Sequence, residues 1–314
     1  MSGSIPVTVV VPVKNEEVML AACLSRLARF SEVIVVDSGS EDRTLDIARA
    51  HGARILDFRW DGRFPKKRNW VLLNEKFANP WVLFLDADEL VSDAFCDAVA
   101  RAISSSAHVG YWLHYTNYFL GRPLRHGVAQ RKLALFKVGA GLYERIEEDN
   151  WSKLDMEVHE HPIIDGPVGE IATRIDHRDD RGVLRFIDRH RDYAQWEAKR
   201  AKALEPFLAN EASQLTSRQR FKYRRLRSWW FPYAYFCAQY FMKLGFLDGH
   251  AGLQYAQLKF WYFSTVRLLL RENAAGEVAD SATQGSEFRP HDSRSLRSGA
   301  KATTSDAEQI ITTS

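Results

Sequence analysis

The first hundred residues alternate between short strand-like runs and longer segments with helical spacing. Four runs are predicted to be strands: Val7–Val13, Val33–Val36, Arg54–Phe58 and Trp81–Leu85. The runs rich in Val, Ile and Leu are typical of strands buried on both faces. Between them, apolar residues recur at helical intervals, as at Leu20, Leu24 and Leu27. Alternating strands and helices predict an α/β fold, a mainly parallel sheet with helices on both faces.

Several polar residues are placed to start these helices. Lys14 or Asn15 can open the first, Ser40 or Asp42 can cap the second, and Ser92 can cap a helix that reaches about residue 103. A further helix is expected over Pro65–Phe77.

The second part of the chain has a different pattern. Gly110–Leu120 is aromatic with partial alternation and Lys132–Lys137 resembles a short strand, so we expect mixed or antiparallel pairing, with a hairpin through Gly121–Pro123. Leu184–Phe207 and Arg218–Glu272 have helical patterns. From residue 273 the chain is rich in Ala, Ser and Thr, which predicts a disordered tail. We therefore divide the chain into residues 1–110, 111–182, 183–272 and 273–314.

Bulk properties narrow the class of protein. The 314 residues can bury a sizeable core, and the net charge of +3 indicates no particular partner by itself. The three cysteines are widely separated, which argues against a disulfide framework or a zinc site. No signal peptide is recognisable, and no stretch of about 18 uncharged apolar residues occurs. We expect a cytoplasmic protein.

Three polar clusters follow predicted strands, at Pro12–Glu16, Asp37–Ser40 and Asp86–Glu89. Ligands bind outside the carboxyl ends of the strands in such sheets, so the clusters should meet at one edge. Carboxylates gathered there suit Mg²⁺ or a similar hard cation, which usually shares its ligands with substrate phosphates. The alternative is that these side chains only cap the helices that follow.

Common nucleotide-binding motifs are missing from the sequence. No GxGxxG follows the first strand, which disfavours a dinucleotide-binding dehydrogenase, and no GxxxxGK[ST] occurs, which disfavours a P-loop kinase or ATPase.

Four segments instead resemble family 2 glycosyltransferases, in order and at family spacing over roughly the first hundred residues. They are Val11-Pro-Val-Lys-Asn-Glu-Glu17, Val-Val-Asp37-Ser-Gly-Ser-Glu-Asp42-Arg-Thr44, Lys67-Arg-Asn69 and Leu85-Asp-Ala-Asp-Glu89. The resemblance implies a GT-A fold, Rossmann-like, that binds a nucleotide-diphosphate sugar, the donor.

The resemblance also implies roles for individual residues. Side chains at the donor site would hold the nucleotide, and Asp37 can accept from the N3–H of a uracil-like base, which favours a UDP-sugar. Asp88 would ligate Mg²⁺ or Mn²⁺ between the two phosphates, with Asp86 near the ribose and the metal. Lys66 and Lys67 read as solvated charges. The full expected donor set is Pro12, Asn15, Glu16, Asp37, Arg68 and Asp86.

Transfer with inversion needs a base on the acceptor side. The segment Met156–His161 resembles the Val-His-Glu segment of the branch that builds bacterial surface polysaccharides. Glu160 is the first choice for the base and Glu157 the second, a preference that rests on the resemblance. His159 reads as a supporting residue, and His177 matches a histidine common in that branch.

The C-terminal region combines basic and aromatic residues. Six Lys and Arg residues between Arg218 and Arg227 precede the aromatic run Trp229–Phe236, a pattern that suits an anionic membrane surface. The resemblance extends loosely to about residue 272 and implies a peripheral enzyme at the inner face of a bacterial membrane. The alternative is a helical extension that only packs on the catalytic domain. No nucleic-acid-binding module is present, so no nucleic-acid partner is expected.

Together these features predict a hexosyltransferase that uses a divalent cation and acts on a lipid-linked or lipopolysaccharide-type glycan. Two alternatives are a sugar nucleotidyltransferase, which would carry a glycine-rich basic loop after the first strand, and a non-catalytic glycan- or lipid-binding protein on the same fold.

Overall fold

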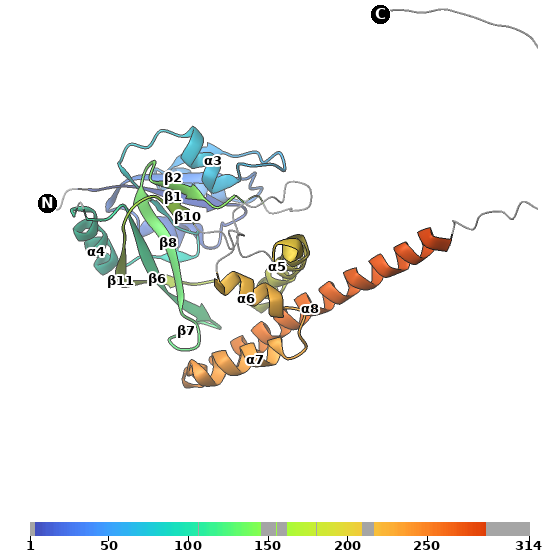
Figure 1. The fold of residues 1–314 in the computed structure, drawn as a ribbon. Helices are drawn as coiled ribbons and strands as arrows, with labels where there is room; N and C mark the ends of the chain where they lie inside the picture. The colour runs from blue at the N-terminus through green and yellow to red at the C-terminus, as the bar shows by residue number, and fades with distance from the viewer. Residues whose placement is uncertain are drawn as a thin grey trace, which may run out of the picture. The chain divides into compact units, whose positions relative to one another are not determined.

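A computed structural model describes residues 4–105, 107–145, 155, 162–179, 181–208 and 217–286 (Figure 1). The chain divides into two units, Met1–Arg271 and Glu272–Ser314. The first unit contains the sheet, the helices before α8 (Gly249–Ser286), and α8 as far as Arg271.

Within the described residues, nine strands form one mixed sheet in the order β3-β2-β1-β4-β8-β6-β11-β5, with β7 paired to β6. β1, β2, β3 and β4 pair in parallel, β8 runs antiparallel to both β4 and β6, and β11 is parallel to β6. The strands are β1 (Ile5–Val13), β2 (Phe30–Asp37), β3 (Arg54–Asp57), β4 (Trp81–Phe84), β5 (Glu89–Leu90), β6 (Gly110–Phe119), β7 (Arg122–Leu124), β8 (Gln130–Lys137) and β11 (Val168–His177). A separate ribbon pairs β9 (Gly141–Tyr143) with β10 (Pro162–Ile164).

Helices cover both faces of the sheet, as the sequence predicts. Alternate residues of β1 point to opposite faces, so Val9 and Val11 join a core with the helices α1 and α4, while Val10 joins a second core with α3. The helices of this part of the chain are α1 (Leu20–Ser25), α2 (Thr44–Ala50), α3 (Lys67–Asn74) and α4 (Asp93–Ile103). Helix α2 connects β2 and β3. The expected fold class, a mostly parallel α/β sheet with a C-terminal helical region, is confirmed.

The predicted helix starts have mixed outcomes. Ser92 caps α4, its side chain accepting from the Phe95 amide at 3.2 Å. The first helix begins at Leu20, so the prediction that Lys14 or Asn15 opens it is wrong. Asn15 has a left-handed backbone, with φ of 55°, which a helix start does not allow. The hairpin is present, and Phe119 pairs with Arg122 across a two-residue turn.

The C-terminal helices form a core of their own. Alanines of α5 pack against Tyr223, Leu226 and aromatic residues of α8. This helical extension also contacts the sheet, because Phe119 and Leu124 share a cluster with Ala251. Figure 1 shows α5, α6, α7 and the start of α8 gathered on one side of the sheet. The elements are α5 (Val183–Leu204), η1 (Glu205–Phe207), α6 (Ser217–Arg225), α7 (Phe231–Cys237), η2 (Ala238–Met242), η3 (Gly245–Asp248) and α8 (Gly249–Ser286).

The C-terminal part of the chain differs from the predicted tail. The chain is still helical between residues 273 and 286, where a disordered tail is expected, and the alanines of that stretch favour helix. Residues 287–314 lie outside the described part. Among the described helices, none combines the length and apolar character that a bilayer crossing requires.

Candidate functional site

The loops after β1 and β2 are joined by hydrogen bonds, so two of the predicted clusters do meet. The Asn15 amide donates to Ser40 Oγ at 2.9 Å, and Asn15 Oδ1 accepts from the Glu41 amide at 2.8 Å. The Glu16 amide donates to Thr44 Oγ1 at 2.7 Å. With its left-handed backbone, Asn15 therefore connects the loop after β1 to the loop after β2.

Asp37 stabilises the turn that follows β2. Its carboxylate accepts from the Gly39 amide at 2.9 Å, the Ser40 amide at 3.0 Å and Ser40 Oγ at 2.5 Å. The Ser40 amide also approaches Oδ1, at 3.2 Å, so both oxygens of Asp37 are engaged by the turn. Pro12 is buried in β1, where it pairs with Val36 next to this turn.

Asp86 lies between two cations at the end of β4. Arg68 Nη2 is 2.8 Å from Asp86 Oδ1 and Lys132 Nζ is 2.7 Å from Asp86 Oδ2. Lys132 also contacts the buried Glu89 at 2.5 Å. Burial opposes ionisation, but Lys132 and Arg68 hold the pKa of Asp86 well below its ordinary value. The pKa of Glu89 is raised, because its burial outweighs the attraction of Lys132.

Asp88 is 8% exposed and faces three basic side chains. Its Oδ1 lies 3.4 Å from His177 Nε2, and its Oδ2 lies 3.3 Å from Arg181 Nη2 and 3.9 Å from Arg189 Nη1. Against the effect of burial, His177 lowers the pKa of Asp88, and Asp88 in turn raises that of His177. Neither Asp86 nor Asp88 caps α4, so that alternative is wrong.

Arg181 links carboxylates from three strand ends. Its Nη1 lies 2.6 and 2.7 Å from the two oxygens of Glu16, its Nη2 contacts Asp88, and its Nε donates to Asp179 at 2.6 Å. Asp179 also pairs with Arg189 at 2.8 Å. Glu16 from β1, Asp88 from β4 and Asp179 from β11 therefore surround one guanidinium.

Asp88 and His177 could hold a divalent cation only if its other ligands came from a substrate. His177 Nδ1 donates to Asn117 Oδ1 at 2.8 Å, an arrangement that directs Nε2 toward Asp88. Adjacent ligands of an octahedral ion lie about 3 Å apart, close to the observed 3.4 Å between Oδ1 and Nε2. The described side chains include no group of three or more His, Cys, Asp or Glu suited to a metal. A cation here would need oxygens from a bound diphosphate.

Lys67 is buried, which corrects the expectation of a solvated charge. Its Nζ donates to the Val13 carbonyl at 3.1 Å and lies 3.2 Å from Asp155 Oδ2, while its amide donates to the Asp155 carbonyl at 3.0 Å. Lys66 is buried as well, at 6% exposure. Asp155 is therefore held beside the carboxyl end of β1. Glu157, His159 and Glu160 lie outside the described residues.

Sequence reasoning missed Lys132, Arg181 and Arg189. Lys132 lies on β8, which is inserted between β4 and β6 in the sheet. No local sequence pattern predicts that β8 pairs with these two strands. The signal for Arg181 was the charged run that follows β11, from Arg178 to Arg181. His177, which the sequence suggests only as a supporting residue, contacts Asp88 and Asn117 within the cluster.

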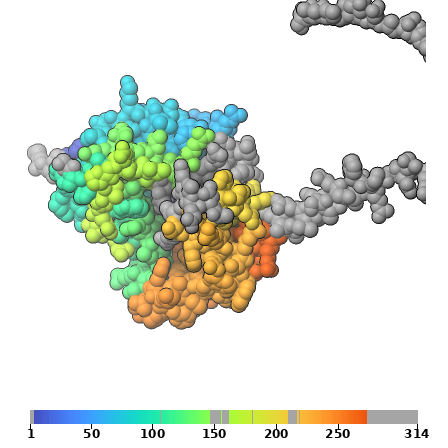
Figure 2. All heavy atoms as spheres, in the orientation of Figure 1, coloured from blue at the N-terminus to red at the C-terminus, as the bar shows by residue number. Residues whose placement is uncertain are grey.

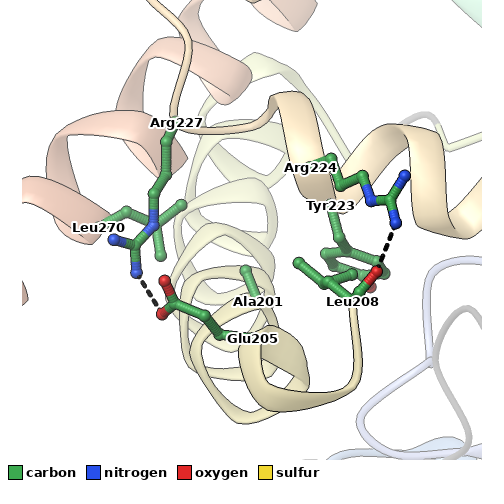
Figure 3. Close-up of a pocket in the computed structure, with 7 residues that line it drawn as sticks. All are labelled: Ala201, Glu205, Leu208, Tyr223, Arg224, Arg227 and Leu270. Carbon is green, nitrogen blue, oxygen red and sulfur yellow. Dashed lines mark hydrogen bonds and ion pairs between the residues drawn. The ribbon is translucent and has the colours of Figure 1, made fainter. Parts of the chain in front are cut away.

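A hollow of about 370 Å³ lies elsewhere, within the helical extension (Figure 3). Its cations are already engaged, since Arg227 pairs with Glu205 at 2.8 Å and Arg224 donates to the Leu208 carbonyl at 2.6 Å. It contains none of the strand-end carboxylates, so it is not the site described above. The residues that line it are Ala201, Glu205, Leu208, Tyr223, Arg224, Arg227 and Leu270.

Residues 8–154 match the model of the glycosyl transferase family 2. The chain is 26% identical over 184 residues to the lipopolysaccharide core biosynthesis glycosyltransferase LpsC of Rhizobium meliloti, a match that covers 55% of this chain and 63% of that protein. It is 26% identical over 279 residues to an uncharacterized glycosyltransferase of Rickettsia bellii, covering 86% of this chain and 90% of the relative.

Among solved structures, glucosyl-3-phosphoglycerate synthase of Mycobacterium tuberculosis in complex with Mn²⁺, uridine diphosphate and glucosyl-3-phosphoglycerate is similar at 23% identity. The match covers 38% of this chain and 45% of that one, with a TM-score of 0.29.

Proposed function

Residues 8–154 belong to glycosyl transferase family 2, and we propose that this enzyme transfers a hexose from a UDP-sugar to a glycan acceptor with inversion. The observation that carries the proposal is the cluster at the carboxyl ends of β1, β4 and β11, where Asp88 and His177 face each other among guanidinium groups. A metal-bound diphosphate is stabilised by protein ligands to the metal and by nearby cations, and Asp88, His177 and the guanidinium groups could serve in these two roles.

Each part of the donor has a matching group. Asp88 and His177 would hold Mg²⁺ or Mn²⁺, which stabilises the negative charge that develops on the departing diphosphate. Asp37, at the end of β2, would accept from a base N–H, and Glu16, in the loop after β1, would accept from a ribose hydroxyl. Arg68, fixed by Asp86, also lies over the Tyr143 ring, with 5.3 Å from Cζ to the ring centroid.

Thermal stability measures donor binding directly, because a ligand that binds only the folded state raises the melting temperature. UDP should raise it in the presence of Mn²⁺ and much less without the metal. Asp88→Asn should lose this metal-dependent effect, whereas Asp46→Asn, which changes an exposed carboxylate on α2, should keep it. If no nucleotide diphosphate or nucleotide sugar stabilises the wild type with Mn²⁺ or Mg²⁺, the proposed function is wrong.

We place the proton acceptor on Glu160, with Glu157 as the second choice. Support comes from Asp155, which Lys67 holds at the donor edge just before this segment begins. Glu160→Gln should bind UDP and Mn²⁺ normally and lose transfer, while Glu157→Gln should retain most transfer. Full transfer by Glu160→Gln would reject the assignment.

The acceptor is proposed to be lipid-linked or of the lipopolysaccharide type, reached at an anionic, cytoplasmic membrane surface. Support comes from the segment after α7, whose large apolar side chains are 43–80% exposed. We call these residues the apolar tip: Phe241, Met242, Leu244, Phe246 and Leu247. Exposed apolar side chains beside cations suit the headgroup region of a bilayer. Lys243 and Arg125 are exposed next to the tip. The α7 region forms the lower edge of the body in Figure 2.

Basic residues of α6 and of the turn that follows it are paired within the protein, which the sequence pattern does not indicate. Lys222 pairs with Glu197 at 2.8 Å and Arg227 with Glu205 at 2.8 Å, inside the helical extension. We therefore assign the membrane contact to the apolar tip instead of α6.

Vesicle sedimentation tests the membrane contact of the apolar tip. The double variant Met242→Glu/Leu247→Glu should lose binding to vesicles that contain phosphatidylglycerol, whereas Leu184→Glu/Leu268→Glu, at two equally exposed leucines elsewhere, should keep it. Equal binding by both variants would contradict the proposed membrane contact.

A further inference from the structure

Arg181 occupies the position between the two carboxylates on which donor binding depends. One guanidinium contacts both oxygens of Glu16, the proposed ribose acceptor, and Asp88, the proposed metal ligand. The side chain is 13% exposed and its third partner is Asp179. No other cation touches both Glu16 and Asp88 among the residues that the structure describes.

This arrangement conflicts with a metal ion at Asp88 unless an anion is also bound. A divalent cation there would stand beside two guanidinium groups that lie 3.3 and 3.9 Å from the same carboxylate oxygen. Like charges at such distances repel strongly in a partly buried site. A diphosphate removes the conflict, since its oxygens can accept from the guanidinium and ligate the metal together.

We infer that Arg181 is a diphosphate-binding residue that neutralises Glu16 and Asp88 when no donor is present and passes to the phosphate oxygens when the donor binds. The inference rests on the proposed function. It assigns to Arg181 a coupling role, because metal and nucleotide would each favour the same displaced state of one side chain.

Arg181 is better placed for this exchange than Arg189. Arg189 extends from α5 and is paired with Asp179 at 2.8 Å, with only a long 3.9 Å approach to Asp88. Arg181 lies on the short connection between β11 and α5, immediately before Gly182, whose φ is 92°. Its displacement would leave Arg189 with Asp179, so the remaining carboxylate keeps a partner.

Mn²⁺ binding, followed by the electron paramagnetic resonance signal of the free ion, tests the exchange without any need for activity. In the wild type, Mn²⁺ alone should bind weakly and UDP should strengthen it strongly. Arg181→Gln should bind Mn²⁺ alone about tenfold more tightly, because the competing cation is gone, and should bind UDP at saturating Mn²⁺ about tenfold more weakly, as loss of a charged hydrogen bond predicts. The factor by which each ligand strengthens the other should fall.

Three further measurements check this result. Arg178→Gln removes a neighbouring positive charge that lies over Tyr118, 4.2 Å from Cζ to the ring centroid, and should change neither affinity. Uridine, which carries no phosphate, should bind wild type and Arg181→Gln equally. Arg181→Lys keeps the positive charge but lacks the planar guanidinium that donates two hydrogen bonds at once. Its affinities for Mn²⁺ and UDP should fall between those of the wild type and Arg181→Gln.

Failure of the proposed function and failure of the Arg181 exchange give different results. If wild type binds no UDP with Mn²⁺, the proposed function and this inference both fall. If wild type binds UDP and Arg181→Gln binds it equally well, or if Mn²⁺ alone binds no more tightly to Arg181→Gln, only the exchange is refuted. A matching loss of uridine affinity would mean a general disturbance of the site, and would also overturn the inference.

Discussion

Lys132 neutralises two carboxylates, and its removal should have a large and pH-dependent cost. Asp86 would keep Arg68 as a partner, but Glu89 is only 1% exposed and pairs with no second cation within the described residues. Removing one member of a buried ion pair costs about 3–5 kcal/mol. Since Lys132 is itself 28% exposed, we expect Lys132→Met to lower the free energy of unfolding at neutral pH by about 3 kcal/mol, the lower end of that range.

The sign of the pH dependence follows from Glu89. Burial already raises the pKa of this carboxyl, and loss of Lys132 would raise it further. A carboxyl whose folded pKa is raised contributes stability at pH values below its unfolded pKa, and that contribution is lost as the pH rises through the folded pKa. The deficit of Lys132→Met should therefore shrink as the pH falls below neutral, because Glu89 then takes up its proton.

Urea unfolding followed by tryptophan fluorescence, repeated at each pH, measures these differences. The double variant Lys132→Met/Glu89→Gln should be more stable at neutral pH than Lys132→Met, because no uncompensated charge is left at position 89. A deficit below about 1 kcal/mol for Lys132→Met, or a double variant whose cost equals the sum of the single costs, would refute the reasoning.

Two further predictions concern how the helical extension is held. Asp248 is 5% exposed and accepts from the Arg125 amide at 3.0 Å and from the amide and Nδ1 of His126 at 2.9 and 3.1 Å, so Asp248→Ala should lower the free energy of unfolding by about 3 kcal/mol in a urea titration. Leu226 is fully buried among α5, α6 and α8, and Leu226→Ala should cost about 3 kcal/mol. Calorimetry should show one transition for Leu226→Ala if the extension unfolds with the sheet, and two if it does not.

The sheet was predictable because its evidence is local. Each strand of the first half carries its own apolar run, and the rule that ligands bind at the carboxyl ends of parallel strands brought Glu16, Asp37 and Asp88 to one edge. The start of α1 was not predictable in this way. It depends on Asn15, whose backbone is fixed by partners in the loop after β2, a contact that helix-capping patterns cannot register.

The cations of the site were missed for a related reason. Lys132 reaches Asp86 only because β8 runs antiparallel between β4 and β6, and Arg181 reaches Glu16 only because β11 ends beside β5. Both contacts join residues far apart in the sequence, and an isolated Lys or Arg reads as a solvated charge. Lys67 was misread in the same way, since its burial depends on Asp155.

The observed pairing also separates the roles of the two aspartates that the sequence had placed together at the metal. Both oxygens of Asp86 are engaged, one by Arg68 and one by Lys132, whereas Asp88 faces His177 across a distance that suits a shared ion. We therefore expect Asp86→Asn to retain most of the Mn²⁺ affinity measured with UDP, and to lose part of the UDP affinity as Arg68 loses its anchor. Asp88→Asn should lose the Mn²⁺. If Asp86→Asn abolishes Mn²⁺ binding as completely as Asp88→Asn does, then Asp86 is a metal ligand and Lys132 must leave it when the donor binds.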